Sequence, residues 1–427
     1  MGELIVDVGG RPGLDCRGFC AYCYFKHVRN PAPLGCRHCL PFKKGCDYCT
    51  RMVREQYDGF RPFRDVAQET LAKLQVATRE IDRVTISGGG DPSCYPAFED
   101  LVEVLAAIEA PLHIGYTSGK GFDDARVADR LVEHGLSEIS FTVFASDPGL
   151  RRRYMHDPTP DVSLAVIERL AGAIDLYAAV VVLPGINDGE VLEQTASWLE
   201  DAGARGLILM RFANEPHQGL VLGNAPLLPG IEPQSVGSFA ALVRDLSARH
   251  RMRITGTPLL DPALGSPFAI RDEPELLARL PRLTGRASVV TGAVAAPFLA
   301  SLLERLGGTA SVVAVRKEIA CLITADDLHE LDPAALERVV VLPGRALVHD
   351  REAEAILSSD GVPRTVVRGP DMLTADGETS MGMNREGVLE MELTGLFHLV
   401  NTINLHGEPG DGDRRTGSGQ ERRAGRS

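Results

Sequence analysis

The stretch that decides the fold is DVGGRPGLDCRGFCAYCYFK, residues 7–26, in which three cysteines are spaced as Cys16-x3-Cys20-x2-Cys23. It begins at the end of a short apolar run that predicts a β-strand. Three thiolates this close in sequence can bind three irons of a 4Fe–4S cluster, and the fourth iron then has no cysteine ligand. An iron left open in this way can be coordinated by a substrate. The competing interpretation is a structural zinc ion held by these cysteines and a histidine such as His27, although structural zinc sites usually pair two short knuckles.

A second motif, SGGGDPS at residues 87–93, follows another predicted strand. The glycines Gly88, Gly89 and Gly90 let backbone groups approach a ligand closely. Radical S-adenosylmethionine (SAM) enzymes typically carry Gly-Gly-Glu-Pro at this place, where the backbone contacts the amino group of SAM. Here an extra glycine and Asp91 replace that pattern. We predict that these four residues bind SAM, and the alternative is an ordinary strand-to-helix turn.

A second cysteine set, Cys36-x2-Cys39-x6-Cys46-x2-Cys49, forms two short knuckles. Four thiolates in a tetrahedral array select iron or zinc. A single metal ion would order the loop at residues 30–52, which lacks the periodicity of a helix or a strand. The rival interpretation is a second iron–sulfur cluster that transfers electrons.

The composition limits the classes of function. The chain has 427 residues, 44% of them hydrophobic, and a formal net charge of −13. This length predicts two domains, or one barrel with an appended module. An acidic chain repels phosphate backbones, so we expect no nucleic-acid partner. The sequence shows neither a signal peptide nor a run near the ~20 apolar residues that cross a bilayer, so we expect a cytoplasmic protein with no membrane partner.

Alternating apolar runs and amphipathic stretches predict a parallel α/β sheet. Counting the strand at residues 4–8, six β/α units fit an open, partial barrel. The other predicted strands are 83–87, 112–117, 138–144, 176–183 and 206–212. The predicted helices are 64–77, 97–109, 124–133, 161–173, 188–202 and 234–249.

We place a domain boundary in a stretch rich in proline and glycine, so that residues 1–284 form the barrel and residues 285–407 form a smaller α/β module. In the module, strands are predicted at 287–291, 311–315, 339–342 and 365–367, and a helix at 295–306. Residues 408–427 have almost no apolar side chains and are predicted to be a disordered tail.

Taken together, these motifs resemble the methanogenesis marker protein 10 family, which are cobalamin-dependent radical SAM methyltransferases. The resemblance rests on residues 7–26, on GCRHCLPFKKGCDYCTR at 35–51, on SGGGDPS at 87–93 and on GYTSGKG at 115–121. It covers the barrel by order and spacing, and the module matches less well.

The resemblance implies roles for particular residues. The first three cysteines would hold the 4Fe–4S cluster, and the second set would hold one iron ion. Tyr116 could ligate the open iron, and Tyr24 could line the active site, although each could simply be a packed aromatic side chain. The module would bind cobalamin. It contains no Asp-x-His-x-x-Gly motif for a lower histidine ligand, so an apolar side chain near Cys321, such as Leu322, could sit under the ring; a core position is the alternative for both.

The resemblance also implies the reaction. The enzyme would methylate the δ-carbon of a peptidyl arginine in the alpha subunit of methyl-coenzyme M reductase, using a 5′-deoxyadenosyl radical, methylcobalamin and a low-potential electron donor. A guanidinium is recognised by carboxylates, for which Asp91, Asp147 and Asp157 are candidates.

Two other functions fit parts of the sequence. One is a different radical SAM enzyme, for peptide maturation or enzyme activation, with an auxiliary iron–sulfur cluster. The other is a non-catalytic zinc-loop interaction protein, against which the barrel pattern and the open cysteine triad argue.

Overall fold

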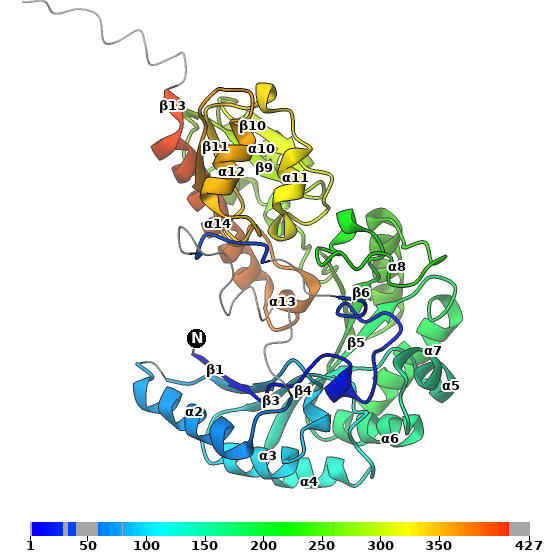
Figure 1. The fold of residues 1–427 in the computed structure, drawn as a ribbon. Helices are drawn as coiled ribbons and strands as arrows, with labels where there is room; N and C mark the ends of the chain where they lie inside the picture. Colours follow the sequence, from blue (N-terminus) through cyan, green and yellow to red (C-terminus); the bar gives the residue numbers. More distant parts are fainter. Residues whose placement is uncertain (1, 29–32, 40–58, 79, 259, 410–427) are drawn as a thin grey trace, which may run out of the picture. The chain divides into compact units, whose positions relative to one another are not determined.

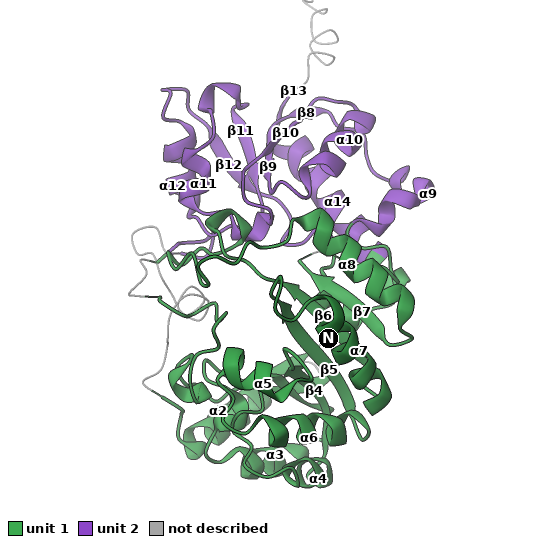
Figure 2. Cartoon of the chain, turned by 90° about the vertical axis from the view of Figure 1, so that its right-hand side faces the viewer, with its two compact units in different colours: residues 1–33, 45–267, 375–388 green, residues 34–44, 268–374, 389–427 purple. Residues whose placement is uncertain are grey.

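The computed structural model describes residues 2–28, 33–39, 59–78, 80–258 and 260–409. The chain divides into two compact units (Figures 1 and 2). Unit 1 comprises residues 1–33, 45–267 and 375–388, and unit 2 comprises residues 34–44, 268–374 and 389–427. The predicted domains 1–284 and 285–407 do not coincide with these units, because unit 2 starts its main segment at residue 268 and a later segment returns to unit 1.

Unit 1 is built on seven parallel strands that pair in the order in which they occur along the chain. They are β1 (Glu3–Asp7), β2 (Arg83–Ser87), β3 (Leu112–Thr117), β4 (Leu136–Thr142), β5 (Asp175–Val182), β6 (Gly206–Arg211) and β7 (Arg253–Thr257). Within the described residues β7 does not pair with β1, so the barrel is open, as the sequence predicted. The central strands are almost entirely buried, as expected for a parallel sheet that is covered on both faces.

Helices connect these strands (Figure 1). They are α2 (Phe63–Val76), α3 (Phe98–Ala106), α4 (Val127–Glu133), α5 (Pro148–Leu150), α6 (Pro160–Ala171), α7 (Gly189–Ala202) and α8 (Val236–Arg249). A π-helical turn, η3 (Arg151–Met155), follows α5, and short 3-10 turns η1 (Leu14–Cys16), η2 (Pro92–Cys94) and η4 (Pro216–Gln218) lie in the loops. The predicted helices and strands of this unit are present, with ends that differ by a few residues.

The six predicted β/α units are present, and a seventh strand, β7, was not predicted because it lies where the sequence turns rich in proline and glycine. Close packing explains why this strand contains a glycine, Gly256. A Cβ there would lie 2.7 Å from the side chain of Val243 on α8, so the helix packs directly on the strand backbone. On α13 (Gly377–Met381), a Cβ at Gly377 would lie 2.4 Å from the carbonyl oxygen of Gly256. A segment from far along the chain therefore covers the last strand of the barrel.

Unit 2 contains a four-stranded parallel sheet in the order β10-β9-β11-β12. Its strands are β9 (Ser288–Thr291), β10 (Ser311–Ala314), β11 (Val339–Leu342) and β12 (Thr365–Arg368), which confirms the four predicted strands. Its helical elements are η5 (Ala269–Asp272), α9 (Pro274–Leu277), α10 (Ala296–Leu306), η6 (Ala320–Leu322), α11 (Ala325–His329), η7 (Pro333–Ala335) and α12 (Asp350–Leu357). Helix α14 (Arg385–His406) contributes its residues from Leu389 onward.

The strand order has a consequence for ligand binding. The chain passes from β9 to β10 on one side of β9 and then crosses to β11 on the other side of β9. The carboxyl ends of β9 and β11 therefore border a topological switch point.

Two residues of the tail that was predicted to be disordered, Glu408 and Pro409, form a short strand. Strand β13 (Glu408–Pro409) pairs with β8 (Gly285–Arg286), and the Glu408 carboxylate lies 3.5 Å from the Arg286 guanidinium. The rest of that predicted tail lies outside the described residues. No helix in the described part of the chain combines the length and the apolar character needed to span a membrane.

Candidate active site

The two main motifs of the sequence meet at one cavity in unit 1. Cys16, Cys20 and Cys23, the glycines 88–90 and Tyr116 all line a cavity of about 210 Å³. The cysteines follow β1, the glycines follow β2 and Tyr116 lies at the end of β3. They meet because the carboxyl ends of parallel strands lie at the same edge of a sheet.

The glycine turn is packed against the segment that follows β1. An added Cβ on Gly88 would lie 2.4 Å from the carbonyl oxygen of Gly9, and one on Gly89 would lie 2.4 Å from that of Gly10. The Gly90 amide donates a hydrogen bond of 3.1 Å to the Gly9 carbonyl. Glycine is therefore required at these positions by contacts with the chain's own backbone. That these glycines also bind SAM stays a prediction.

Asp91 lines the cavity, but the chain's own donors occupy its carboxylate. Ser93 donates to it from its amide at 3.0 Å and from its hydroxyl at 2.8 Å. The Thr117 hydroxyl donates at 2.6 Å, and Ser118 donates from its amide at 2.9 Å and also from its hydroxyl. The side chain therefore ties the turn after β2 to the end of β3. Any contact of Asp91 with SAM through its backbone remains a prediction.

Burial makes the cysteines poor acids while they carry no metal. It raises the pKa of the Cys16 thiol to about 12, and the nearby Asp91 carboxylate adds to this shift. Burial likewise raises the pKa of the Cys23 thiol to about 11, and it also raises the pKa of the Cys20 thiol. A metal binds the thiolate form of cysteine, so metal binding at this site must displace the thiol protons and release them.

A lysine completes the wall of the cavity. The Lys120 ammonium is 1% exposed and donates to the Gly18 carbonyl at 2.7 Å and to the Met155 carbonyl at 3.1 Å. It also lies 3.9 Å from the sulfur of Cys20. Lys120 belongs to the GYTSGKG segment at 115–121 but was not selected as a site residue, because lysines are usually exposed.

Tyr116 has a partner that sequence reasoning missed. Its hydroxyl donates a hydrogen bond to the carboxylate of Glu378 on α13. Burial raises the pKa of the Tyr116 phenol, and the charge of Glu378 raises it further. Burial also raises the pKa of Glu378. No local pattern links two residues so far apart in the sequence.

Two other predicted site residues are placed elsewhere. Tyr24 does not line this cavity; its hydroxyl donates to the Gly219 carbonyl at 3.0 Å and accepts from the Val221 amide at 3.4 Å. A backbone contact therefore occupies the group that was expected to act in the site. Leu322, which was predicted for the cobalamin-binding module and not for this cavity, lies in unit 2 within the 3-10 turn η6.

The carboxylates proposed for an arginine substrate are also engaged. Asp157 is buried and lies 2.8 Å from the buried guanidinium of Arg151. Asp147 accepts from the Leu150 amide at 2.6 Å and caps α5. Asp91 is held as described above, so all three serve structural contacts.

Half of the second cysteine set is described. Cys36 and Cys39 are buried, and the Cys39 amide donates to the Cys36 carbonyl at 3.1 Å, as expected of a knuckle. Cys46 and Cys49 lie outside the described residues, so the metal site of this loop stays a prediction. Within the described ranges, no three histidine, cysteine or acidic side chains converge on one point suited to a metal ion.

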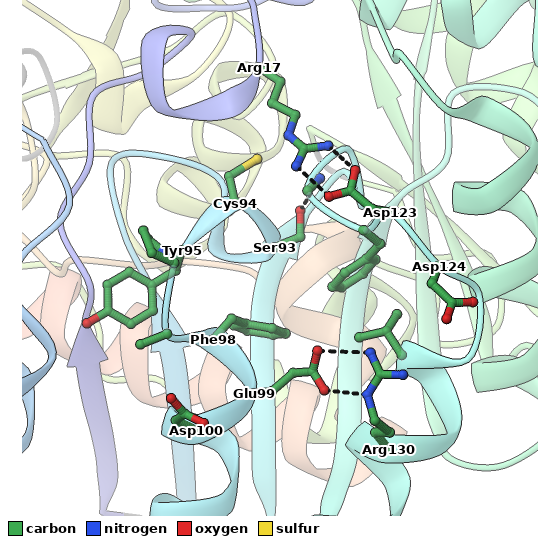
Figure 3. A pocket seen from close by; sticks show the side chains of 15 residues that line it. Arg17, Ser93, Cys94, Tyr95, Phe98, Glu99, Asp100, Asp123, Asp124 and Arg130 are labelled. Carbon is green, nitrogen blue, oxygen red and sulfur yellow. Dashed lines mark hydrogen bonds and ion pairs between the residues drawn. The ribbon is translucent and has the colours of Figure 1, made fainter.

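A second, larger cavity of about 540 Å³ is lined by Arg17, which directly follows Cys16 in the sequence (Figure 3). The Arg17 guanidinium lies 2.7 Å from the Asp123 carboxylate. Arg130 lies 2.5 Å from Glu99, and both ion pairs are bidentate. The sequence did not indicate this cavity.

Comparisons with known proteins match one segment of the chain to a family model. The model of the radical SAM superfamily matches residues 11–198. GTP 3′,8-cyclase from Trichormus variabilis is 28% identical over 168 residues, which are 38% of this chain and 48% of that protein. The chain thus spans about half the length of the curated relative that it matches.

Solved structures overlap more loosely. Methylornithine synthase has a TM-score of 0.36 at 14% identity, over 73% of this chain and 70% of that one. A radical SAM methyltransferase from Sphaerobacter thermophilus has a TM-score of 0.36 at 17% identity, over 60% and 64% of the two chains.

The matched residues include the three cysteines, the glycine turn, Tyr116 and Lys120, which are the residues that the structure gathers at one cavity. This superfamily implies a 4Fe–4S cluster and SAM. Residues 11–198 of this chain therefore form a radical SAM superfamily domain.

Proposed function

We propose that this protein is a cobalamin-dependent radical SAM methyltransferase that methylates the δ-carbon of a peptidyl arginine in the alpha subunit of methyl-coenzyme M reductase. The observation that carries the proposal is the cavity shared by the three cysteines, the glycine turn and Tyr116. The radical chemistry follows from the superfamily, and the substrate follows from the resemblance of the cysteine motifs.

The residues present suit a 4Fe–4S cluster. Cys16, Cys20 and Cys23 face one cavity and supply three sulfur ligands, and the Lys120 ammonium supplies a positive charge beside them. The cluster, when bound, supplies the electron that cleaves SAM to the 5′-deoxyadenosyl radical. Tyr116 lines the same cavity, and its hydroxyl would have to leave Glu378 to ligate the open iron until SAM takes that position.

The chain's own residues would orient the substrate. Glu378 places a carboxylate beside Tyr116, which lines the cavity. A guanidinium pairs bidentately with a carboxylate, and its positive charge would favour the ionised form of Glu378. Glu378 therefore replaces the three aspartates as the candidate partner of the arginine.

Unit 2 is the proposed site for cobalamin. The carboxyl ends of β9 and β11 border a switch point, where open α/β sheets bind ligands. The Thr291 hydroxyl, at the end of β9, is buried without a hydrogen-bond partner in the described structure, so a ligand atom could satisfy it. Leu322 is the proposed apolar side chain below the ring. Cobalamin would supply the methyl group.

The four cysteines of the loop at residues 30–52 are proposed to hold one iron ion. Iron analysis tests this directly, because one 4Fe–4S cluster and one ion give about five iron atoms per chain, whereas two such clusters give about eight.

The proposal is tested with protein purified without oxygen and reconstituted with iron and sulfide. It receives SAM, cobalamin, a low-potential reductant and a peptide that carries the arginine of the reductase. We expect mass spectrometry to detect one added methyl group, fragment ions to place it on the δ-carbon, and omission of cobalamin to abolish it. In E378Q, which keeps a hydrogen-bond acceptor without the charge, we expect at least a tenfold loss of methylation at unchanged iron content.

Three controls separate the parts of the proposal. A matched peptide with lysine in place of arginine should not be methylated. Methylation that persists without cobalamin would contradict the cobalamin assignment. Deoxyadenosine without any methylated peptide would contradict the substrate while leaving the radical SAM chemistry intact.

A further inference from the structure

Lys120 is a buried cation without an anionic partner in the described structure. Its side chain is 1% exposed. The ammonium contacts two carbonyl oxygens, of Gly18 and Met155, and lies near the sulfur of Cys20. Among the described residues, no carboxylate lies within 4.0 Å of it, the distance that defines an ion pair.

Two other buried cations among the described residues are paired with carboxylates. The Arg151 guanidinium, also fully buried, lies 2.8 Å from Asp157. Lys317 lies 3.0 Å from Asp327. Removing a charge from water is costly, and proteins compensate for it with an opposite charge nearby. Among the described residues no carboxylate is in direct contact with Lys120, and the Asp91 carboxylate of the same cavity is bound by serine and threonine donors.

The cysteine site supplies an anion beside Lys120 once it is loaded. Three thiolates contribute three negative charges and the oxidised 4Fe–4S core contributes two positive ones, so the loaded site carries a net charge of about −1 before SAM binds. One added electron makes it about −2. A fixed positive charge 3.9 Å from the Cys20 sulfur stabilises the reduced form more than the oxidised form.

We propose that Lys120 is the built-in counter-charge of the 4Fe–4S cluster and that it makes the cluster easier to reduce. The proposal rests on the cluster that the radical SAM domain implies, and it is independent of the arginine substrate and of cobalamin. Net charge and hydrogen bonds to sulfur are established determinants of cluster potentials, so the effect has a physical basis.

The test measures the reduction potential of the reconstituted cluster, by redox titration followed by the electron paramagnetic resonance signal of the reduced form. K120M removes the charge and keeps most of the volume, and K120Q removes the charge and keeps a donor. The matched control is K26M, since the Lys26 ammonium donates to the Ala21 carbonyl of the same loop at 3.3 Å but is half-exposed.

We expect K120M and K120Q to shift the reduction equilibrium toward the oxidised cluster by at least tenfold, which corresponds to about 59 mV for one electron. K26M should change it by less than a third of that. We also expect K120M to retain less iron after exposure to a chelator than the wild type does.

Two outcomes would overturn the proposal. One is a potential in K120M equal to that of the wild type. The other is a wild-type potential in K120Q alongside a shifted one in K120M, which would assign the effect to hydrogen bonding instead of charge. Methylation is not part of either readout, so the proposed function can fail without affecting this result. A wild-type chain that assembles no cluster would contradict the radical SAM assignment itself.

Discussion

The buried pair Arg151–Asp157 allows a quantitative test of how unit 1 is held together. Both side chains are essentially inaccessible to solvent, and the Asp157 carboxylate receives two bonds from the guanidinium, at 3.0 and 2.8 Å. The guanidinium also donates to the carbonyls of Val143 at 2.6 Å and Ser118 at 2.8 Å. The pair therefore fastens η3 to the ends of β3 and β4, beside the cysteine site.

The substitution D157N keeps the shape of the side chain and removes its charge. It leaves a buried guanidinium without compensation, and its amide group presents donors where the carboxylate accepted. Breaking a buried pair in this way costs roughly 3–5 kcal/mol, so we expect D157N to lower the free energy of unfolding of unit 1 by about that amount. The double variant R151M/D157L removes both charges and should lose less than D157N alone.

Urea unfolding followed by tryptophan fluorescence measures this loss. The chain has one tryptophan, Trp198, which lies on α7 and packs against the core of unit 1, so the signal reports on that unit. The matched control is D129N. Asp129 lies 2.8 Å from Arg169, the same separation as in the buried pair, but both side chains are about half-exposed and the pair should contribute no more than about 1 kcal/mol. Equal losses in D157N and D129N would refute the reasoning.

The remaining predictions concern pH and backbone packing. Burial, with a smaller contribution from Arg83, lowers the pKa of His113 from its ordinary value of 6.5 to about 4. Between these values the unfolded chain binds more protons than the folded chain, so folding stability should fall as pH drops from 6.5 to 4, by at most about 3 kcal/mol. H113Q should flatten this part of the pH profile measured by Trp198 fluorescence, and an unchanged slope would contradict it. In G88A the new methyl group would meet the Gly9 carbonyl oxygen at 2.4 Å, so we expect a loss of roughly 1–3 kcal/mol and reduced iron binding. G361A is the control, since a Cβ at Gly361 meets nothing within 4 Å, although its φ of +85° adds local strain.

Much of the active site could be predicted because the rules that apply to it are local or topological. The cysteine spacing identifies the ligands, and strand periodicity places the two motifs after successive strands. Parallel strands then bring Cys16, Gly88 and Tyr116 to one edge without further information. The same reasoning found the four strands of the sheet in unit 2.

What could not be predicted depends on contacts between distant parts of the chain. Glu378 reaches Tyr116 only because α13 is fastened to β7, where the Thr255 hydroxyl donates to the Gly377 carbonyl at 2.7 Å and Arg253 donates to the Ser380 carbonyl at 2.7 Å. No periodicity in the sequence encodes such a contact. Strand β7 itself was missed for a related reason, since its glycine is required by packing and reads, in the sequence alone, as a break.

The two buried cations beside the cysteines, Arg151 and Lys120, differ in whether a carboxylate is paired with them. Arg151 is neutralised by Asp157, whereas no carboxylate among the described residues forms an ion pair with Lys120; the Asp91 carboxylate also acts on Cys20, without such contact. K120M removes the charge of Lys120, and D157N would leave a second cation unpaired beside Cys20, because Arg151 is close enough to influence the pKa of Cys20. If charge controls the potential, a folded D157N protein should hold a cluster that is easier to reduce than the wild type, and K120M one that is harder to reduce. Shifts of the same sign in both variants would mean that the substitutions act by disturbing the packing around the cysteines, which both cations also support through bonds to backbone carbonyls.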